Sequence, residues 1–402
     1  MVVRRDPRSA RLASGADLWQ RCCFRGGKCW RHIALARWRA VRDESHLSMS
    51  TDIQKRKVDH LDLCATDAVA FKSQTNLLGN VRLMHQSLPD LALSDLDLRV
   101  NLLGKELRAP IVIAAMTGGT DLAADVNQTL ASVANDRGYG FGLGSQRAMQ
   151  KSPETAWTYQ VRERAPNVLL LGNVGVVQAR DMRTSEVQAM LDAIGADALC
   201  IHLNPAMELV QPGGDRDFRD GTATIKRFVQ ELDLPVVAKE TGNGISAETA
   251  NRLFEAGVRY VDVSGAGGTS WVGVETLRAE GLERALGEML WDWGVPTAAA
   301  VHYASREGLT VIATGGIRTG YDIARAIALG ATAGGIARFV FQAFRQGGRE
   351  GAERFLDQVE QELRAVMLLS GCRTIDELRR APRIIRGELR DWMGHHADTH
   401  AR

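Results

Sequence analysis

Long hydrophobic runs are missing from this sequence of 402 residues. None approaches the ~18 apolar residues that a membrane-crossing helix needs, so we expect no membrane span. The N-terminal stretch also lacks the apolar segment of ~7–15 residues that a secretory signal carries. The overall composition, with 45% hydrophobic and 24% charged residues, is that of an ordinary globular protein with enough apolar material for a large core.

Cysteine is scarce, with six residues in the whole chain. Cys64, Cys200 and Cys372 are far apart and lie in apolar or helical contexts. This pattern predicts a reduced, cytoplasmic protein without disulfides. The other three cysteines lie close together near the N-terminus, where a metal-binding knuckle is an open alternative; they are Cys22, Cys23 and Cys29.

Acidic residues are few in residues 1–48, where ten Arg and one Lys stand against four acids, although the whole chain carries a net charge of only +2. The segment also has no hydrophobic periodicity. We interpret it as a disordered or spurious basic leader, with Met49 as the true start. An arm that binds nucleic acid is the alternative. For the remaining chain we expect neither a nucleic-acid partner nor a membrane partner.

Eight short apolar runs alternate with amphipathic stretches from residue 111 onward. Residues 122–133, for example, place an apolar side chain at every third or fourth position and are followed by Gly138, a helix-ending signal. Apolar strands that alternate with helices predict a parallel sheet covered by helices. Eight units favour an α/β fold of the closed (β/α)₈ TIM-barrel type, with an open doubly wound sheet as the alternative. The predicted strands are residues 111–116, 141–145, 168–174, 198–203, 235–240, 258–264, 310–315 and 334–337.

The chain on either side of these runs has its own character. Residues 49–110 form an N-terminal lead-in with mixed polarity, and residues 111–345 form the barrel. Residues 346–402 are expected to be C-terminal helices that pack on the barrel, including one long helix over residues 353–369. Capping signals predict further helix starts at Ser246, at Thr319 with Asp322, and at Thr374 with Glu377.

Polar and glycine-rich sequences follow the predicted strands at their carboxyl ends, where a barrel of this kind forms its active site. One such glycine or serine would indicate only a turn or a helix cap, but all eight strand ends carry polar or glycine-rich residues. They read MTGG (116–119), GSQR (144–147), GNVG (172–175), HLN (202–204), KE (239–240), SGAGGTS (264–270), TGGIR (314–318) and AR (337–338).

Two of these strand ends predict particular chemistry. After the seventh strand, the glycine-rich turn with Arg318 leads into the helix start at Thr319, and this combination predicts an anion site at the phosphate position of a barrel. Lys239 follows a very apolar run, which directs its ammonium toward the barrel axis. A buried cation needs an anion. That anion is either Glu240, although adjacent strand residues point to opposite faces, or a ligand that becomes anionic, such as a reduced flavin.

These motifs, taken in order with RKVDH (56–60), AMTGG (115–119) and GAGGTSW (265–271), resemble the FMN-dependent type 2 isopentenyl-diphosphate isomerases. The resemblance covers residues 51–345 and most of the tail. It implies a (β/α)₈ barrel that holds FMN, needs Mg²⁺ and works with flavin reduced by NAD(P)H. The implied reaction interconverts isopentenyl and dimethylallyl diphosphate without net redox change. The resemblance also implies a homo-oligomer, either a tetramer or an octamer.

The resemblance assigns roles to individual residues. It implies that the lead-in, residues 49–110, also contains an arm that contacts the substrate. The implied FMN contacts are Ala115, Met116, Thr117, Ser145, Asn173, Lys239, Thr269, Gly316, Arg318, Ala337 and Arg338. The implied substrate contacts are Arg56, Lys57, His60, Ser145, Arg147 and Met207. The implied catalytic residues are His202, Asn204 and Lys239, and the implied Mg²⁺ ligand is Glu208.

The residue types fit several of these roles. His202 and Asn204 are two apart on one strand and so face the same side, into the barrel mouth. Arg56 and His60 share a helical face, and a diphosphate is well bound by fork-shaped and point cations together. Glu208 offers the hard oxygen that Mg²⁺ prefers. Without the resemblance, a solvated charge cluster and an exposed loop glutamate are the alternatives.

Met207 departs from the family pattern, which usually has glutamine beside the metal-binding glutamate. A thioether is at best a weak hydrogen-bond acceptor, so a mechanism that assigns the proton to this side chain is in doubt. The reduced flavin itself then serves as acid and base, while the protein supplies position and charge.

Other flavin or nucleotide chemistry remains an alternative on the same barrel. A 2-hydroxy-acid oxidase needs a histidine base near the end of the seventh strand, and residues 313–318 contain none. A nucleotide dehydrogenase needs a nucleophilic loop cysteine, whereas Cys200 lies within a predicted strand. A third alternative is a flavin-binding barrel with impaired catalysis, for which Met207 is the evidence.

Overall fold

The computed structural model describes the backbone of residues 47–399 and the side chains of residues 56–394. The predicted leader and the cysteine group Cys22, Cys23 and Cys29 therefore lie outside the described residues, apart from the last two leader positions. In the described part, Cys64, Cys200 and Cys372 are free thiols, as predicted. Within the same residues, no helix is both long and apolar enough to cross a bilayer.

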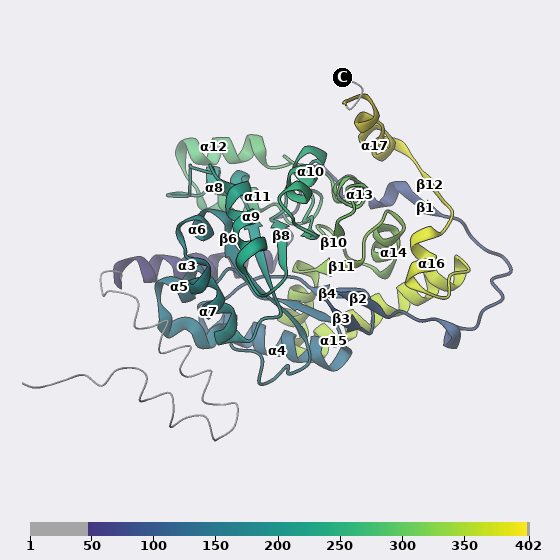
Figure 1. Ribbon diagram of the computed structural model, residues 1–402, viewed down its shortest axis with the longest axis horizontal. Coiled ribbons are helices and arrows are strands. Elements are labelled where there is room, and N and C mark those ends of the chain that lie inside the picture. The colour runs from purple at the N-terminus through teal and green to yellow at the C-terminus, as the bar shows by residue number, and fades with distance from the viewer. Residues whose placement is uncertain (1–46, 400–402) are drawn as a thin grey trace, which may run out of the picture.

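Eight parallel strands close into a barrel in the spatial order β10-β11-β4-β5-β6-β7-β8-β9, which is the predicted (β/α)₈ architecture and excludes the open sheet (Figure 1). Each predicted strand is present, with its ends shifted by a few residues. The strands are β4 (Ile111–Ile113), β5 (Gly140–Gly142), β6 (Leu169–Gly175), β7 (Ala198–Leu203), β8 (Val236–Glu240), β9 (Tyr260–Asp262), β10 (Thr310–Thr314) and β11 (Ala333–Ile336).

Helices surround this barrel in the order in which they follow the strands (Figure 1). Their starts and ends carry the predicted signals: Gly138 ends one helix in the left-handed conformation, and Thr319 and Asp322 form a capping box. The helices are α4 (Asp121–Arg137), α5 (Arg147–Lys151), α6 (Val176–Asp181), α7 (Thr184–Ile194), α8 (Pro205–Val210), α9 (Gly221–Glu231), α10 (Ala247–Glu255), α11 (Trp271–Arg278), α12 (Gly281–Leu290), α13 (Thr297–Arg306) and α14 (Gly320–Ala328). The 3₁₀ helix η3 (Pro153–Tyr159) lies beside α5.

The lead-in and tail flank the barrel. The lead-in contains α3 (Leu47–Cys64), η1 (Leu78–Asn80), β1 (Val81–Leu83), η2 (Leu93–Asp95) and the hairpin β2 (Val100–Leu102) and β3 (Lys105–Leu107). The tail contains α15 (Arg338–Leu369), α16 (Ile375–Arg380), β12 (Arg383–Ile385) and α17 (Gly387–Thr399). The predicted helix over 353–369 is the second part of α15, beyond a kink at Gly347 and Gly348. β12 pairs with β1, so the tail and lead-in meet on one side of the barrel (Figure 1).

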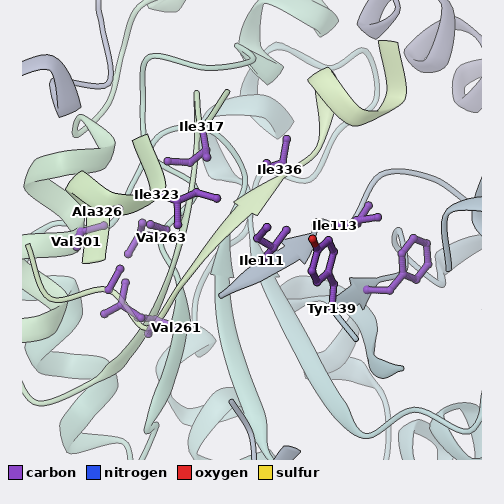
Figure 2. Packing of buried hydrophobic residues seen from close by; sticks show 14 of the residues in the cluster. Ile111, Ile113, Tyr139, Val261, Val263, Val301, Ile317, Ile323, Ala326 and Ile336 are labelled. Carbon is purple, nitrogen blue, oxygen red and sulfur yellow. The ribbon is translucent and has the colours of Figure 1, made fainter. Parts of the chain in front are cut away.

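Strand alternation divides the core into two apolar layers. Outward side chains such as Ile111, Ile113 and Val261 pack against helix residues such as Ile323 (Figure 2). Inward side chains form a separate cluster inside the barrel, which the leucines of the β2–β3 hairpin cover from below. The inward members on the strands include Val112, Leu171, Cys200, Val237 and Ile312.

The same alternation sets the polar layer above the inner cluster. Because side chains on one face recur at every second residue, Leu171 is followed by Asn173 and Cys200 is followed by His202. In the same way, Val237 precedes Lys239, Tyr260 precedes Asp262, and Ile312 precedes Thr314. The barrel interior therefore changes from apolar to polar toward the carboxyl ends of the strands, and Cys200 belongs to the core as predicted.

Candidate active site

One cavity opens at the carboxyl ends of the strands, with a volume of about 1570 Å³ including its open mouth. Every predicted site residue lines it except Arg318. The lining contains Arg56, Lys57, His60, Ala115, Met116, Thr117, Ser145, Arg147, Asn173, His202, Asn204, Met207, Glu208, Lys239, Thr269, Gly316, Ala337 and Arg338. The cavity also has members that the sequence reasoning did not name, among them Gln178, Gln211, Trp271 and Thr314.

His202 is held in one orientation and one tautomer by Asn173. The Asn173 amide nitrogen donates to the Leu143 carbonyl at 3.1 Å, which leaves its Oδ1 to accept from His202 Nδ1 at 2.7 Å. His202 Nε2 is then an acceptor. Burial, followed by the positive charges of Lys239, Lys57 and Arg147, lowers the pKa of His202 to about 3. The ring is a neutral hydrogen-bonding group and not a cation.

Lys239 has an anionic partner that the sequence analysis did not name, since it considered only Glu240 or an anionic ligand. Its ammonium lies 2.8 Å from Asp262 Oδ2 on the neighbouring strand β9, and both side chains are buried. It also donates to the main-chain carbonyl of Glu240 at 3.2 Å. Of the two alternatives for Lys239, pairing with the Glu240 carboxylate is wrong, because that side chain accepts hydrogen bonds from the backbone N–H groups of Gly242, Asn243 and Gly244. Burial raises the pKa of Glu240 to about 8.

Three cations gather at the arm side of the cavity, and among the described residues their only ion-pair partner is Asp215, 3.7 Å from Arg147. Arg56 and Lys57 come from α3, and Arg147 begins α5. The Nε atoms of Arg56 and Arg147 are buried and have no hydrogen-bond partner among the described residues. Lys57 Nζ lies 3.4 Å from the Ser145 carbonyl. Burial, together with the positive charges of Arg56 and Arg147, lowers the pKa of Lys57 to about 7. Buried positive charges need a compensating anion, so this cluster is suited to bind an anionic ligand.

His60 joins the arm to the barrel. Its Nε2 lies 2.8 Å from Glu275 Oε1 on α11, and its ring meets the Trp271 ring edge to face at 5.2 Å between centroids. Glu275 is fully buried and also pairs with Arg278 at 2.7 Å, which in turn contacts Asp59 at 3.1 Å. His60 thus lines the cavity but uses one nitrogen to dock α3 on α11. The sequence reasoning missed Glu275.

Glu208 is a buried carboxylate surrounded by neutral donors. Its Oε1 accepts from Asn204 Nδ2 at 3.0 Å. Its Oε2 accepts from the Asp215 backbone N–H at 2.7 Å and from Gln211 Nε2 at 3.3 Å. These bonds orient the carboxylate but leave its charge without a salt bridge. In the described residues no three His, Cys, Asp or Glu side chains gather as a metal cluster. This arrangement fits Mg²⁺, which proteins often hold with one or two carboxylates plus water and substrate phosphate oxygens.

The predicted phosphate site needs a correction in one part. The N-terminus of α14 is already occupied, because Asp322 Oδ2 accepts from Arg318 and Thr319 N–H and Glu362 accepts from Gly320 N–H. The Arg318 side chain is exposed and lies outside the cavity lining. The helix start that lines the cavity belongs instead to α15.

The N-terminus of α15 makes the better anion site. Ala337, Arg338 and Phe339 line the cavity, and the N-cap residue Ala337 makes no side-chain cap. The first N–H groups of the helix are therefore free to meet a ligand. Gly315 and Gly316 lie beside it in the same lining, both at positive φ. The start of α15 and the Gly315–Gly316 turn therefore fit an anion better than the start of α14 does.

Further unpaired atoms show that a polar ligand fits the upper barrel. Thr117 Oγ1, Thr314 Oγ1 and Arg338 Nε are buried, line or border the cavity, and have no hydrogen-bond partner. A side chain at Gly335 would collide with Thr314, so this position of the cavity wall needs a residue without a side chain. Buried polar groups rarely remain unsatisfied. The residues present therefore fit FMN, with Thr117, Asn173, Lys239, Thr269, Gly316, Ala337 and Arg338 as the residues that would hold it.

Comparison with known proteins agrees with the fold. The chain matches the FMN-dependent dehydrogenase family over residues 49–203 and 206–385. Solved mandelate oxidase structures share the fold. One bound to an FMN monooxide adduct has a TM-score of 0.55 and 20% identity, covering 81% of this chain and 95% of that chain. Another has a TM-score of 0.57 and 19% identity, covering 85% and 99%. The class is thus a flavin-type (β/α)₈ barrel.

Curated relatives narrow this class. An isopentenyl-diphosphate delta-isomerase from Methanosarcina barkeri is 44% identical over 352 residues, covering 86% of this chain and 96% of the relative. The enzymes of that name from Methanothermobacter thermautotrophicus and Nostoc sp. are 41% and 42% identical, covering 85% and 83% of this chain and 96% of each relative. The chain therefore belongs to the isopentenyl-diphosphate delta-isomerases of the FMN-dependent dehydrogenase family, as the motif resemblance predicted.

Proposed function

We propose that this protein interconverts isopentenyl diphosphate and dimethylallyl diphosphate. The observation that carries the proposal is the cluster of Arg56, Lys57 and Arg147 on the arm side of a cavity whose barrel side fits FMN. Among the described residues, the only ion-pair partner of this cluster is Asp215, which lies 3.7 Å from Arg147. A flavin barrel that acts on a small carboxylic acid has no need of three clustered cations. A diphosphate does, because it carries several negative oxygens that accept both fork-shaped and point donors.

The residues of the chain bind and orient the substrate. Arg56, Lys57 and Arg147 hold the diphosphate, and Glu208 holds Mg²⁺ against its oxygens. His202 offers a neutral Nε2 in a fixed direction because Asn173 holds its other nitrogen. α3 covers the cavity through the His60–Glu275 contact, which limits the entry of water to the allylic part of the substrate. Lys239 and Asp262 present an ion pair of fixed geometry on the barrel side.

Four ionisable side chains that line the cavity, His202, Glu208, Lys239 and Lys57, are not suited to move the substrate proton. The pKa of His202 is far below neutral, and the Glu208 carboxylate is held by three N–H donors. Lys239 is paired, and Lys57 lies at the diphosphate end. Reduced FMN, when bound, supplies a group that can both give and take a proton. The side chains then need only to hold the substrate against it.

Met207 supports this division of labour. It lies in the first turn of α8 between Asn204 and Glu208, lines the cavity, and has its sulfur 3.9 Å from Asn204 Nδ2. Its thioether cannot donate a proton. We propose that Met207 shapes the apolar part of the pocket and takes no part in proton transfer. Met207 also supports the alternative of a flavin-binding barrel with impaired catalysis.

Several finer assignments belong to the proposal. We propose Mg²⁺ as the metal and NAD(P)H as the reductant of the flavin. We also propose assembly as a homo-oligomer, tetrameric or octameric, and a role in supplying the isoprenoid pathway. A cytoplasmic location is supported by the free thiols Cys64, Cys200 and Cys372, because thiols stay reduced there.

One assay tests the function. Purified protein is incubated with isopentenyl diphosphate, FMN, Mg²⁺ and NADPH or NADH, and dimethylallyl diphosphate is measured. We expect product only when FMN, the metal and a reductant are all present. Protein that binds FMN but forms no product would support the impaired barrel. Reduction of bound FMN by 2-hydroxy acids, without isomerisation, would support the oxidase alternative.

A further inference from the structure

The loop between α8 and α9 wraps around the carboxylate of Glu208. The backbone N–H of Asp215, in this loop, donates to Glu208 Oε2 at 2.7 Å. Arg216 donates to the main-chain carbonyls of Glu208 and of Gln211, the latter at 3.4 Å. A side chain at Gly214 would collide with the carbonyl and carboxylate oxygens of Glu208, so the loop can pass this close only with glycine there. These contacts fix the position of Asp215 relative to Glu208.

The same loop brings the Asp215 carboxylate to the cation cluster. Its Oδ2 accepts a hydrogen bond from Gln178 Nε2 of α6 at 2.7 Å and lies 3.7 Å from Arg147 Nη1. The second distance is that of an ion pair but is longer than a hydrogen bond. Asp215 therefore acts on Arg147 by charge and leaves the guanidinium N–H groups to donate elsewhere. The buried Nε of Arg147 has no hydrogen-bond partner among the described residues.

Gln178 holds this carboxylate from the cavity side. Its amide lines the cavity, whereas Asp215 lies outside the lining. A Cβ atom at Gly175 would collide with Gln178 Oε1 and would lie 2.9 Å from His202 Nε2, so the amide packs closely beside the barrel wall. Asp215 can thus influence a ligand only through its charge and its neighbours. It is a positioning residue and not a catalytic one.

Asp215 connects two parts of the site that attract opposite charges. Its backbone orients Glu208, the proposed Mg²⁺ ligand, and its side chain contacts Arg147, which belongs to the proposed diphosphate site. A negative charge at this point opposes the binding of a free anion and favours a bound cation. The effect of Asp215 on a metal-free diphosphate should therefore be opposite in sign to its effect on Mg²⁺.

We propose that Asp215 makes the site selective for the Mg²⁺ complex of a diphosphate over the metal-free diphosphate. This inference rests on the proposed function, which supplies the diphosphate and the metal. It assigns a role to a residue that is neither the predicted metal ligand nor a member of the cation cluster. Among the described residues, no other carboxylate lies within ion-pair distance of Arg56, Lys57 or Arg147.

Calorimetric titration of the FMN-loaded full chain with pyrophosphate tests the proposal. Asp215→Asn keeps the shape and the backbone N–H that holds Glu208 but removes the charge. We expect the variant to bind metal-free pyrophosphate more tightly than wild type does. The gain in pyrophosphate affinity on addition of Mg²⁺ should shrink by at least ~fivefold, the low end of typical coupling between two ligands. FMN binding and the melting temperature check the fold.

Three further variants separate charge from structure. Asp217→Asn is the matched control, because Asp217 lies in the same loop but pairs with Arg219 and Arg180. It should keep the wild-type gain from Mg²⁺. Asp215→Glu retains the charge and should restore part of the gain that Asp215→Asn loses. Gln178→Leu keeps the native loop but removes the hydrogen bond to Asp215, so it should lose a smaller part of the gain.

Three outcomes would contradict the proposal, and they differ in what else they affect. If Asp215→Asn keeps the wild-type gain from Mg²⁺, this inference is wrong and the proposed function stands, because the site still binds a diphosphate. If the variant binds pyrophosphate more weakly by the same factor with and without Mg²⁺, Asp215 has only a structural role. Wild-type protein that binds pyrophosphate neither with nor without Mg²⁺ would overturn the proposed function together with this inference.

Discussion

The two sides of the cavity differ in how their charges are balanced. On the barrel side, Lys239 pairs with Asp262 and His202 with Asn173 before any ligand binds. On the arm side, Arg56 and Lys57 have no ion-pair partner among the described residues, and Arg147 has Asp215 at 3.7 Å. The difference indicates two kinds of function. We interpret the barrel side as a support. The arm side is a binding surface whose positive charges are balanced only when an anionic ligand binds.

The largest effect is expected for a substitution on the barrel side of the cavity, where the charges are paired. Asp262→Asn leaves Lys239 as a buried cation without its partner, which typically costs ~3–5 kcal/mol of unfolding free energy. Chemical denaturation measures this loss. The unbalanced positive charge should also raise the midpoint potential of bound FMN, because it favours the reduced, more negative form of the flavin.

A second variant separates pairing from other effects of the same substitution. Asp262→Asn combined with Lys239→Met removes both charges, so its stability should recover part of the loss. If the double variant is as unstable as the sum of the two single variants, the pair contributes nothing and the support role of the barrel side is wrong.

The next effect concerns Glu208, a carboxylate without a salt bridge. Glu208→Gln keeps the shape but removes the charge, so the Mg²⁺ concentration needed for half-maximal activity should rise. The rise should exceed the ~10–100-fold that loss of an outer partner of a metal ligand costs. FMN binding should be unchanged. Glu240→Gln is the matched control, because Glu240 is equally buried but is bonded to loop N–H groups. An unchanged Mg²⁺ requirement in Glu208→Gln would mean that substrate and water alone hold the metal.

The arm side predicts a pH dependence. Because the pKa of Lys57 is lowered to about 7, Lys57 loses its charge in the ligand-free protein as the pH rises through that value. Pyrophosphate binding needs the charged form, so its affinity should fall above pH 7 by up to ~tenfold per pH unit for one linked proton. Lys57→Arg remains charged and should remove this component. Calorimetric titration of both proteins from pH 6 to pH 9 measures it, since the titration of pyrophosphate itself is common to both.

The stability of the ligand-free protein should change in the opposite direction. The folded pKa of Lys57 lies below the unfolded value, so the charged form destabilises the fold. This destabilisation is fully present below pH 7 and disappears as the pH rises toward the ordinary lysine pKa of 10.5, which holds in the unfolded chain. The contribution of Lys57 to stability therefore rises with pH across this range, whereas its contribution to pyrophosphate binding falls.

The smallest effect is expected at Met207. Methionine and glutamine are unbranched and similar in length, so Met207→Gln should fit the pocket. If the side chain only shapes the pocket, turnover should change by no more than one hydrogen bond, ~0.5–1.5 kcal/mol or about a factor of ten. A catalytic acid or base is worth ~10²–10⁴-fold. A gain of ~100-fold or more in the steady-state turnover of Met207→Gln would show that the wild-type protein lacks a proton donor at position 207.

Sequence periodicity was sufficient for the barrel and for the strand ends that line the cavity, whereas the roles of individual residues came from the motif resemblance. Eight apolar runs gave eight strands, and side chains at their carboxyl ends converged because parallel strands in a closed barrel all end on one face. Asp262 could also have been found in this way, since it lies two residues before Ser264 on an inward face. It was missed because only the last residues of each run were considered.

Other parts of the site depend on contacts between distant segments. His60 and Glu275 are 215 residues apart, and Glu275 lies within a helix, away from any strand end. One part of the phosphate prediction, the N-terminus of α14, was wrong for a related reason. The capping box at Thr319 already indicated that the N–H groups of α14 were occupied, and Glu362 of α15 supplied a further acceptor that no local pattern could reveal.

The most direct test compares one lysine from each side of the cavity. The melting temperature of the FMN-loaded protein is measured with and without pyrophosphate for wild type, Lys57→Met and Lys239→Met. Removing the unpaired cation should raise the melting temperature of the ligand-free protein and reduce the stabilisation by pyrophosphate. Removing the paired cation should lower the melting temperature and preserve that stabilisation. If both variants lose stability and both keep the pyrophosphate effect, the arm side is not a binding surface for a diphosphate.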